Sequence, residues 1–278
     1  MEILRYASFT TDSAGGNPAG VVLDARGMDD AAMLVVAANV GFSETAFVMT
    51  QPDGSLKVRY FSPAVEVPFC GHATIATAVA WAQRHGPGDL QFHTKAGPVS
   101  VATENGRNGS IVATLVSVPP RSSPIAPADL AALLQALRWR PEELDSALPP
   151  RVAYAGAWHP IIAAADRARL ARLDYDRAAL LEIMGYHDWV TIDLVWRESP
   201  TVYHARNPFP PGGIIEDPAT GAAAAAFGGY LREMELVPLP ARIDIHQGQD
   251  MGRPSLIAVT IPAEPGSGIA VTGTAVQL

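Results

Sequence analysis

The sequence predicts an α+β fold of two pseudo-symmetric lobes, each with a curled, mainly antiparallel sheet around a central helix. Two helix-like segments are rich in alanine and apolar nearly all round, which is typical of a helix covered on every side. Both segments open alike: EVPFCGHATIATA begins at Glu66 and EDPATGAAAAAF begins at Glu216. Each follows a strand-like segment and ends at charged residues. The chain therefore reads as two copies of one supersecondary unit.

The composition is that of a packed globular protein that acts on small molecules. Of the 278 residues, 48% are hydrophobic and only 17% are charged. The net charge of −8, with no run of basic residues, argues against binding to nucleic acid or to an anionic membrane. The start MEILRYASFT does not match a signal peptide, and no stretch reaches the ~18 apolar residues of a membrane span. One cysteine excludes an internal disulfide, and a cytoplasmic location is expected.

The first lobe, residues 1–121, is predicted to be mostly strands. A helix is expected over residues 29–41, capped by Asp29 or Asp30 and closed by Gly41. GGNPAG, from Gly15, is predicted to be a turn. An Asn-Gly turn joins the last two strands as a hairpin. The expected strands cover residues 3–9, 20–25, 45–49, 55–61, 90–94, 98–104 and 110–118.

A segment rich in proline and serine, VPPRSSPIAPADL from Val118, is predicted to link the lobes, with the boundary near Ser122. The second lobe is then residues 122–278. Its last strand, over 268–278, could pair with either lobe. Besides the alanine-rich segment, the expected helices cover 128–137, 167–173 and 175–187, and the other expected strands lie within 151–165, 189–198, 201–207, 241–248 and 255–263.

Gly71 and Gly221 stand at the starts of the two alanine-rich helices. Glycine lets a ligand approach the backbone closely, and the first turn of a helix offers unpaired N–H groups at its positive end. If approximate twofold symmetry relates the lobes, both starts can face one cleft and hold a single carboxylate-bearing ligand. The alternative is structural, since glycine-initiated alanine-rich helices also occur in ordinary cores.

Five motifs carry a strong resemblance to the PhzF family of phenazine-biosynthesis isomerases: GGNPAGVVLDA, GFSETAFVM, FSPAVEVPFCGHATIATA, EDPATGAAAAAF and HQGQDMGRPSL. They span Gly15 to Ser255 in the order of the family. The resemblance implies the fold of diaminopimelate epimerase and proline racemase, with an active site between the lobes. The sequence contains no metal-ligand spacing, no Walker-type phosphate loop and no GxGxxG fingerprint, so no metal and no other cofactor are expected. The resemblance favours a homodimer, although the sequence leaves the oligomeric state open.

By the same resemblance, the acid/base glutamate of the family falls on Glu44. This chain departs from the family at Ala222, where members often carry serine, so the substrate need not be the phenazine precursor. The predicted catalytic residues are Glu44, His72 and Asp217, and the predicted substrate-binding residues are Ser43, Gly71, Gly221, Ala222, Asn17 and Cys70.

Several of these residues also have structural interpretations. His72 and Asp217 could cap or pack against their helices. Asn17, and likewise the pair Gly252 and Arg253, could shape the cleft or could simply form turns. Cys70, near a helix start, could be an activated thiol or a small packed residue. The matching position of the second copy is Thr220, which excludes a two-thiol racemase.

The sequence therefore predicts an isomerase or epimerase that works without a cofactor. Glu44 would move a proton within a small, carboxylate-bearing metabolite whose identity stays open. Two alternatives remain: a thiol enzyme that uses Cys70 and His72, and a metabolite-binding module of the same fold without catalysis.

Overall fold

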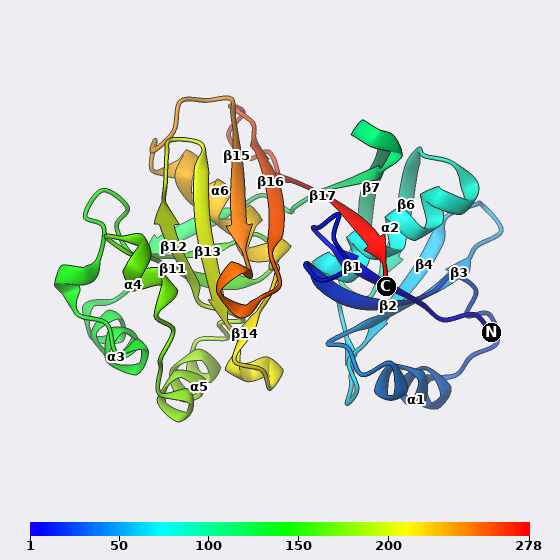
Figure 1. Ribbon diagram of the computed structural model, residues 1–278, viewed down its shortest axis with the longest axis horizontal. Coiled ribbons are helices and arrows are strands. Elements are labelled where there is room, and N and C mark those ends of the chain that lie inside the picture. Colours follow the sequence, from blue (N-terminus) through cyan, green and yellow to red (C-terminus); the bar gives the residue numbers. More distant parts are fainter. The chain divides into compact units, whose positions relative to one another are not determined.

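The computed structural model describes residues 1–278, except the side chain of Asn108, and it is an α+β structure in which strands predominate (Figure 1). It divides into two compact units. The first unit comprises Met1–Val116, Gly252–Leu256 and Thr272–Leu278, and the second comprises Ser117–Met251 and Ile257–Val271. The division falls before the predicted boundary at Ser122, because residues just after Val116 are already tied to the second unit. The backbone N–H of Ser117, for example, donates to the carbonyl of Ile269 at 2.9 Å.

The first unit contains two α-helices among its strands. Its elements are β1 (Leu4–Ser8), β2 (Asn17–Val22), α1 (Asp30–Val40), β3 (Thr45–Thr50), β4 (Leu56–Phe61), β5 (Glu66–Val67), α2 (Gly71–His85), β6 (Asp89–Thr94), β7 (Gly97–Asn105), the 3-10 turn η1 (Arg107–Gly109) and β8 (Ile111–Val116). The C-terminal strand β17 (Ala270–Gln277) starts in the second unit and pairs antiparallel with β1, Tyr6 lying opposite Gln277.

Local sequence signals define α1 as predicted. The Asp29 carboxylate accepts a hydrogen bond from the Ala32 N–H at 2.8 Å, and Gly41 ends the helix in the left-handed conformation at φ 74°. The prediction for GGNPAG was wrong in part, because β2 already starts at Asn17. Asn17 pairs with Ser8 of β1, so the turn is confined to the residues before it.

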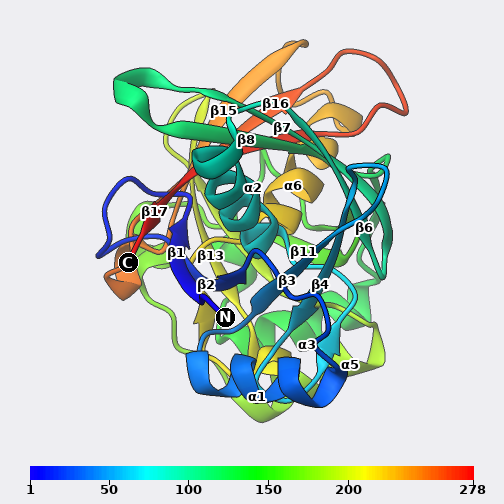
Figure 2. The same ribbon diagram turned by 90° about the vertical axis from the view of Figure 1, so that its right-hand side faces the viewer.

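Helix α2 is the buried centre of the first unit, and Figure 2 shows it among the strands. It packs against β1, β2, β3, β7 and β8, and it forms the crossover between the parallel strands β4 and β6. Successive strand residues face opposite sides of the sheet. Accordingly, Phe61 packs in the cluster beneath α1, while Tyr60 hydrogen-bonds Thr74 of α2.

The second unit repeats this plan with additional helices. Its elements are β9 (Arg121–Pro124), α3 (Pro127–Leu137), η2 (Pro141–Glu143), β10 (Arg151–Tyr154), β11 (Trp158–Ala163), α4 (Arg167–Ala171), α5 (Arg177–Tyr186), β12 (Asp193–Arg197), β13 (Val202–Pro208), η3 (Pro210–Gly212), β14 (Glu216–Asp217), α6 (Gly221–Glu233), β15 (Ala241–Gln247), η4 (Gln249–Met251) and β16 (Ser255–Ile261), whose first two residues belong to the first unit. Within the part of the chain that the structure describes, no helix has the length and apolar character needed to cross a membrane.

Helix α6 holds the place in its unit that α2 holds in the first. It joins the parallel strands β13 and β15, it follows the two-residue strand β14, and it packs against β9, β10 and β11. A second core lies where α3 and α5 meet the sheet, with Leu133, Leu180 and Ile162 fully buried there. The predicted α+β class with a central helix in each unit is confirmed. The parallel pairings at the crossovers were not predicted.

Close packing around α6 requires glycine, which gives a first testable prediction. A Cβ atom on Gly229 would lie 2.3 Å from Cβ of Pro120. We therefore expect Gly229→Ala to destabilise the protein by about 1–3 kcal/mol, as overpacked cores do. The control is Gly185→Ala in α5, where no atom lies within 4 Å of the added Cβ. Chemical denaturation should show unchanged or higher stability for the control, and equal behaviour of the two variants would contradict the packing argument.

Candidate active site

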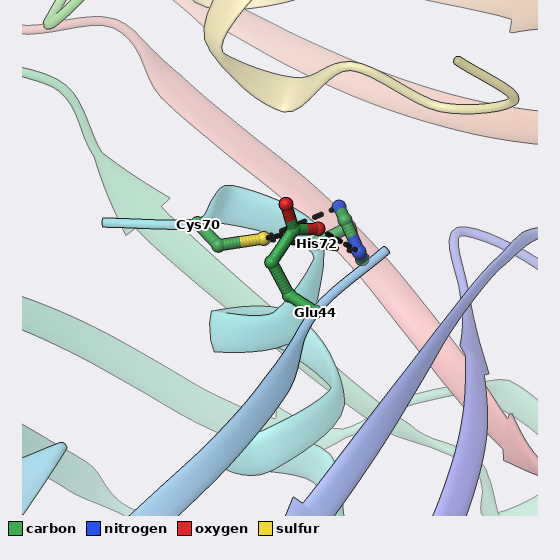
Figure 3. A group of neighbouring side chains, drawn as sticks. All are labelled: Glu44, Cys70 and His72. Atoms are coloured by element: carbon green, nitrogen blue, oxygen red, sulfur yellow. Dashed lines mark hydrogen bonds and ion pairs between the residues drawn. The ribbon is translucent and has the colours of Figure 1, made fainter. Parts of the chain in front are cut away.

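Three chemically active side chains converge in the first unit at the start of α2. The Oε2 atom of Glu44 lies 3.3 Å from Nε2 of His72, and the Cys70 thiol can donate to the same oxygen at 3.5 Å. The sulfur of Cys70 also lies 3.4 Å from Nδ1 of His72. Figure 3 shows the Glu44 carboxylate directed at both partners. Glu44 is half-buried while the other two are buried, so the carboxylate meets a mostly enclosed environment.

The backbone around Glu44 is fixed by the sheet. Glu44 immediately precedes β3, and its carbonyl accepts a hydrogen bond from the Gly20 N–H of β2 at 3.1 Å. Gly20 is needed for this approach, because a Cβ atom there would lie 2.5 Å from Oγ1 of Thr45. A strand pairing therefore fixes the backbone from which the Glu44 side chain extends.

The start of α2 is held by hydrogen bonds from neighbouring elements. The carbonyl of Cys70 accepts from both the N–H and the hydroxyl of Thr74, at 3.0 and 2.7 Å. The Ser8 hydroxyl of β1 donates to the carbonyl of His72 at 2.7 Å. Since the helical bonds begin at Thr74, the N–H groups from Gly71 onward carry the positive end of the helix dipole toward this cluster.

Two further predicted residues flank the cluster. The Ser43 hydroxyl lies 3.4 Å from Nε2 of His72. Asn17 is buried in β2, opposite the Ser8 that supports His72. Arg253, considered for shaping the site, donates from its guanidinium to the carbonyls of Gly15 and Gly16 at 2.5 and 2.8 Å, so it fixes the turn before Asn17.

The remaining predicted residues, Asp217, Gly221 and Ala222, belong to the second unit. Asp217 is buried and accepts a hydrogen bond from the Thr220 hydroxyl at 2.7 Å. Gly221 opens α6 and Ala222 follows it, half-buried. Asp217 is therefore part of the turn that leads into α6, although it is not the residue at the N-terminal cap position, which is Thr220.

Gln247 completes this turn and was missed by the sequence reasoning. Its amide nitrogen donates to the carbonyl of Asp217 at 2.7 Å, and its amide oxygen accepts from the N–H of Thr220 at 3.0 Å. Gln247 lies within the HQGQDMGRPSL motif, which was the available signal. Only the fold shows that this motif reaches the start of α6.

In each unit, an arginine–glutamate ion pair also holds the turn that leads into the central helix. In the first unit Nε of Arg59 donates to Glu66 of β5 at 2.8 Å, and the Arg59 contact is the main cause that lowers the pKa of Glu66. In the second unit the Arg206 guanidinium binds both oxygens of Glu216 in β14, with Nε 2.9 Å from Oε2. In each unit, the arginine lies two residues before the strand residue that pairs with the glutamate. The repeat thus extends to how each helix start is anchored.

Behind β14 lies a chain of buried polar groups. His159 contacts the Thr191 hydroxyl at 2.9 Å, Thr191 donates to Asn207 at 2.7 Å, and Asn207 donates to Asp193 at 3.0 Å. The backbone of Asn207 pairs with Asp217. Burial raises the pKa of Asp193 to about 7 and lowers that of His159 to about 4.

These shifts predict a specific pH dependence. The Asp193 pKa rises from 3.8 to about 7 on folding, so the folded state binds the extra proton and stability from this group falls as pH rises through that range. His159 acts in the opposite direction, because stability falls as pH drops below 6.5. We therefore expect the free energy of unfolding of Asp193→Asn, measured in urea and relative to that of wild type, to be higher at about pH 8 than at about pH 5. An equal difference at both pH values would contradict this.

The structure thus brings Glu44, Ser43, Cys70, Gly71 and His72 into one cluster, supported by Asn17 through β1 and β2. It brings the second group of predicted residues, Asp217 to Ala222, into one turn within the second unit.

Comparison with known proteins agrees with the resemblance predicted from the motifs. The PhzC-PhzF family model, described as phenazine biosynthesis-like protein, matches residues 6–278. An uncharacterized isomerase of Escherichia coli O157:H7, YddE, is 31% identical over 94% of this chain and 90% of its own length. The trans-2,3-dihydro-3-hydroxyanthranilate isomerase of Pseudomonas aeruginosa is 30% identical, over 89% of this chain and 86% of that protein.

Solved structures share the fold over nearly the full length. A Bacillus anthracis phenazine biosynthesis protein of the PhzF family superposes with a TM-score of 0.89 at 26% identity, covering 100% of this chain and 98% of that one. A probable proline racemase from Agrobacterium radiobacter K84 reaches a TM-score of 0.65 at 12% identity, covering 99% and 90%. The second likeness concerns the fold alone.

Proposed function

Because this chain belongs to the phenazine biosynthesis-like (PhzC-PhzF) family, it is a PhzF-like isomerase, and we propose that Glu44 is its acid and base. The reaction is a proton shift within a small carboxylate-bearing metabolite, without a cofactor. Glu44 removes a proton from one carbon, the electron pair left behind delocalises within the substrate, and the same carboxyl returns the proton to another position. No electrons are gained or lost overall.

The observation that supports this role is the position of the Glu44 carboxylate. It is half-buried at the start of α2 and within 3.3 Å of Nε2 of His72. A general base must lie where a bound substrate can reach it, and a neighbouring imidazole can donate to or steer the group that it serves. The N–H groups from Gly71 onward offer a place for the substrate carboxylate.

The names of the relatives indicate the general class of the substrate. The Pseudomonas aeruginosa relative is named for a dihydro-hydroxyanthranilate, an amino- and hydroxyl-bearing cyclic acid. We propose that the substrate here is also a small carboxylate. Ala222 replaces the serine common in the family, which removes one hydroxyl donor beside Gly221 and favours a ligand with one polar group fewer at that position.

The contact between Cys70 and His72, 3.4 Å from sulfur to Nδ1, supports a second candidate, a thiol enzyme. The two proposals differ in which residue is indispensable. Iodoacetamide inactivation that substrate prevents, together with complete loss of activity in Cys70→Ser, would support the thiol enzyme. Retention of measurable turnover by Cys70→Ser would support Glu44.

The deciding experiment is solvent-deuterium exchange, followed by mass spectrometry over a panel of hydroxy, amino and dihydroaromatic acids. Protein dialysed against a chelator and given no cofactor is expected to incorporate deuterium into at least one acid. Tight binding of an acid without any exchange would instead indicate the metabolite-binding module. Exchange that appears only after a cofactor is added would contradict cofactor independence.

A further inference from the structure

The Gln247 side chain joins three groups of the turn that leads into α6. Its amide nitrogen donates to the carbonyl of Asp217 at 2.7 Å and to the hydroxyl oxygen of Thr220 at 3.0 Å. Its amide oxygen accepts from the Thr220 N–H at 3.0 Å. Gln247 is 2% exposed, so water does not compete for these bonds. Both N–H groups of the amide are therefore used within the turn.

The backbone fixes the direction of every hydrogen bond in this group. A backbone carbonyl only accepts and a backbone N–H only donates, so the amide of Gln247 has one permitted orientation. Its second N–H then points at the Thr220 oxygen, which accepts it. The proton of the Thr220 hydroxyl goes to Oδ2 of Asp217, 2.7 Å away. Asp217 is therefore held as a hydrogen-bond acceptor at that oxygen.

Thr220 does not serve the usual purpose of a threonine at its position. It is the cap residue of α6, and a cap threonine ordinarily accepts a hydrogen bond from an N–H of the first helical turn. Here the oxygen accepts from Gln247, and the proton is donated to Asp217. The hydroxyl thus orients a carboxylate instead of capping the helix.

The first copy of the repeat shows that a central helix can start without this arrangement. Val67 holds the place of Asp217, because each is the second residue of its short strand. The turn after Val67 is held by a backbone bond, in which the Ala96 N–H donates to the carbonyl of Pro68 at 3.1 Å. Since a backbone bond suffices there, the side-chain bonds of the second copy serve more than the shape of the turn.

We propose that Gln247 is a positioning residue, which acts through Thr220 to hold the Asp217 carboxylate in one orientation as an acceptor for an amino or hydroxyl group of the substrate. Carboxylate oxygens accept hydrogen bonds, so they favour a ligand that brings an N–H or O–H group. A site built around such a bond rejects the analogue that lacks the donor. The turn therefore selects amino or hydroxy acids. This assignment rests on the proposed function in one respect, that the ligand is a small carboxylic acid.

The test compares the binding of anthranilate and benzoate to the full chain, since these two cyclic acids differ only in an amino group. Isothermal titration is expected to show that wild type binds anthranilate at least about tenfold more tightly, as a hydrogen bond to a charged group provides. Gln247→Leu lets the Thr220 hydroxyl turn to the helix, and Thr220→Val removes it. In both variants the two dissociation constants should agree within about threefold. Thr220→Ser keeps the hydroxyl and should retain the preference.

The matched control is Gln249→Leu, because Gln249 carries the same amide two residues further on, at an exposed position of η4. It should keep the preference for anthranilate. Circular dichroism and urea denaturation check the fold of each variant, and Thr220→Val decides the matter if Gln247→Leu does not fold. Equal binding of the two acids by wild type, binding of neither, an unchanged preference in Thr220→Val or its loss in Gln249→Leu would overturn the proposal.

Glu44→Gln separates this proposal from the proposed function. It should keep the preference for anthranilate while losing deuterium exchange, because Gln247 acts on binding and Glu44 on proton transfer. If wild type exchanges no acid at all, the proposed function fails, while the two dissociation constants still decide the role of Gln247.

Discussion

Replacing Glu44 with glutamine is expected to lower turnover and solvent exchange by about 10²–10⁴-fold, the usual contribution of a general acid or base. The amide keeps the size of the side chain and can still hydrogen-bond His72, but it cannot accept a proton from carbon. Ligand binding and the free energy of unfolding should change little. Steady-state kinetics, isothermal titration and chemical denaturation measure the three quantities separately.

Glu104→Gln is the matched control, because Glu104 is an exposed glutamate on β7 of the same unit. It removes the same charge without touching the cluster and should retain full activity. If Glu44→Gln also turned over at a near-normal rate, Glu44 would have no part in the chemistry, and the Cys70 and His72 pair would become the candidate.

The largest expected effect on stability comes from Arg206→Ala in the second unit. Arg206 and Glu216 are both buried, with side chains 9% and 5% exposed. The guanidinium also donates to the carbonyl of Ala171. Removing the arginine leaves a carboxylate inside the protein without its partner, so unfolding should require about 3–5 kcal/mol less. Urea denaturation measures this loss.

The internal repeat supplies the control for this prediction. Arg59 and Glu66 hold the same place in the first unit, but their side chains are 18% and 17% exposed. Water can reach the Glu66 carboxylate when the arginine is removed, so Arg59→Ala should lower the free energy of unfolding by only about 0–1 kcal/mol. The double variant Arg206→Met with Glu216→Leu should recover most of the stability lost in Arg206→Ala, since it leaves no unpaired charge. Equal losses at the two arginines would show that burial does not govern the pair.

Local features could be predicted because neighbouring residues determine them. The cap of α1 at Asp29 and its end at Gly41 depend on backbone groups within one turn of each residue. The alanine-rich helices were also predictable, because a segment that is apolar on all faces is stable only when it is covered. The place of Glu44 came from the resemblance, since its flanking residues alone do not distinguish a base from a carboxylate at a strand end.

Features that depend on distant partners could not be predicted in this way. The role of Gln247 depends on β15 lying beside the start of α6, and the pairing of Arg206 with Glu216 depends on the register of β13 and β14. The parallel pairs β4–β6 and β13–β15 likewise could not be predicted from hydrophobic periodicity. That pattern indicates which face of a strand is buried, but it does not identify the strand that pairs with it.

The sequence by itself determined the two-copy design, the central helices and the family to which the chain belongs. The sequence also identifies the side chains that could react, because residue types and their spacing are properties of the chain. Only the tertiary structure decided that Glu44 lies 3.3 Å from His72 and 3.5 Å from Cys70. That contact requires β3 to be paired with β2 and the start of α2 to be held by β1. Such long-range hydrogen bonds and packing are fixed by the whole fold, and no local preference of the residues specifies them.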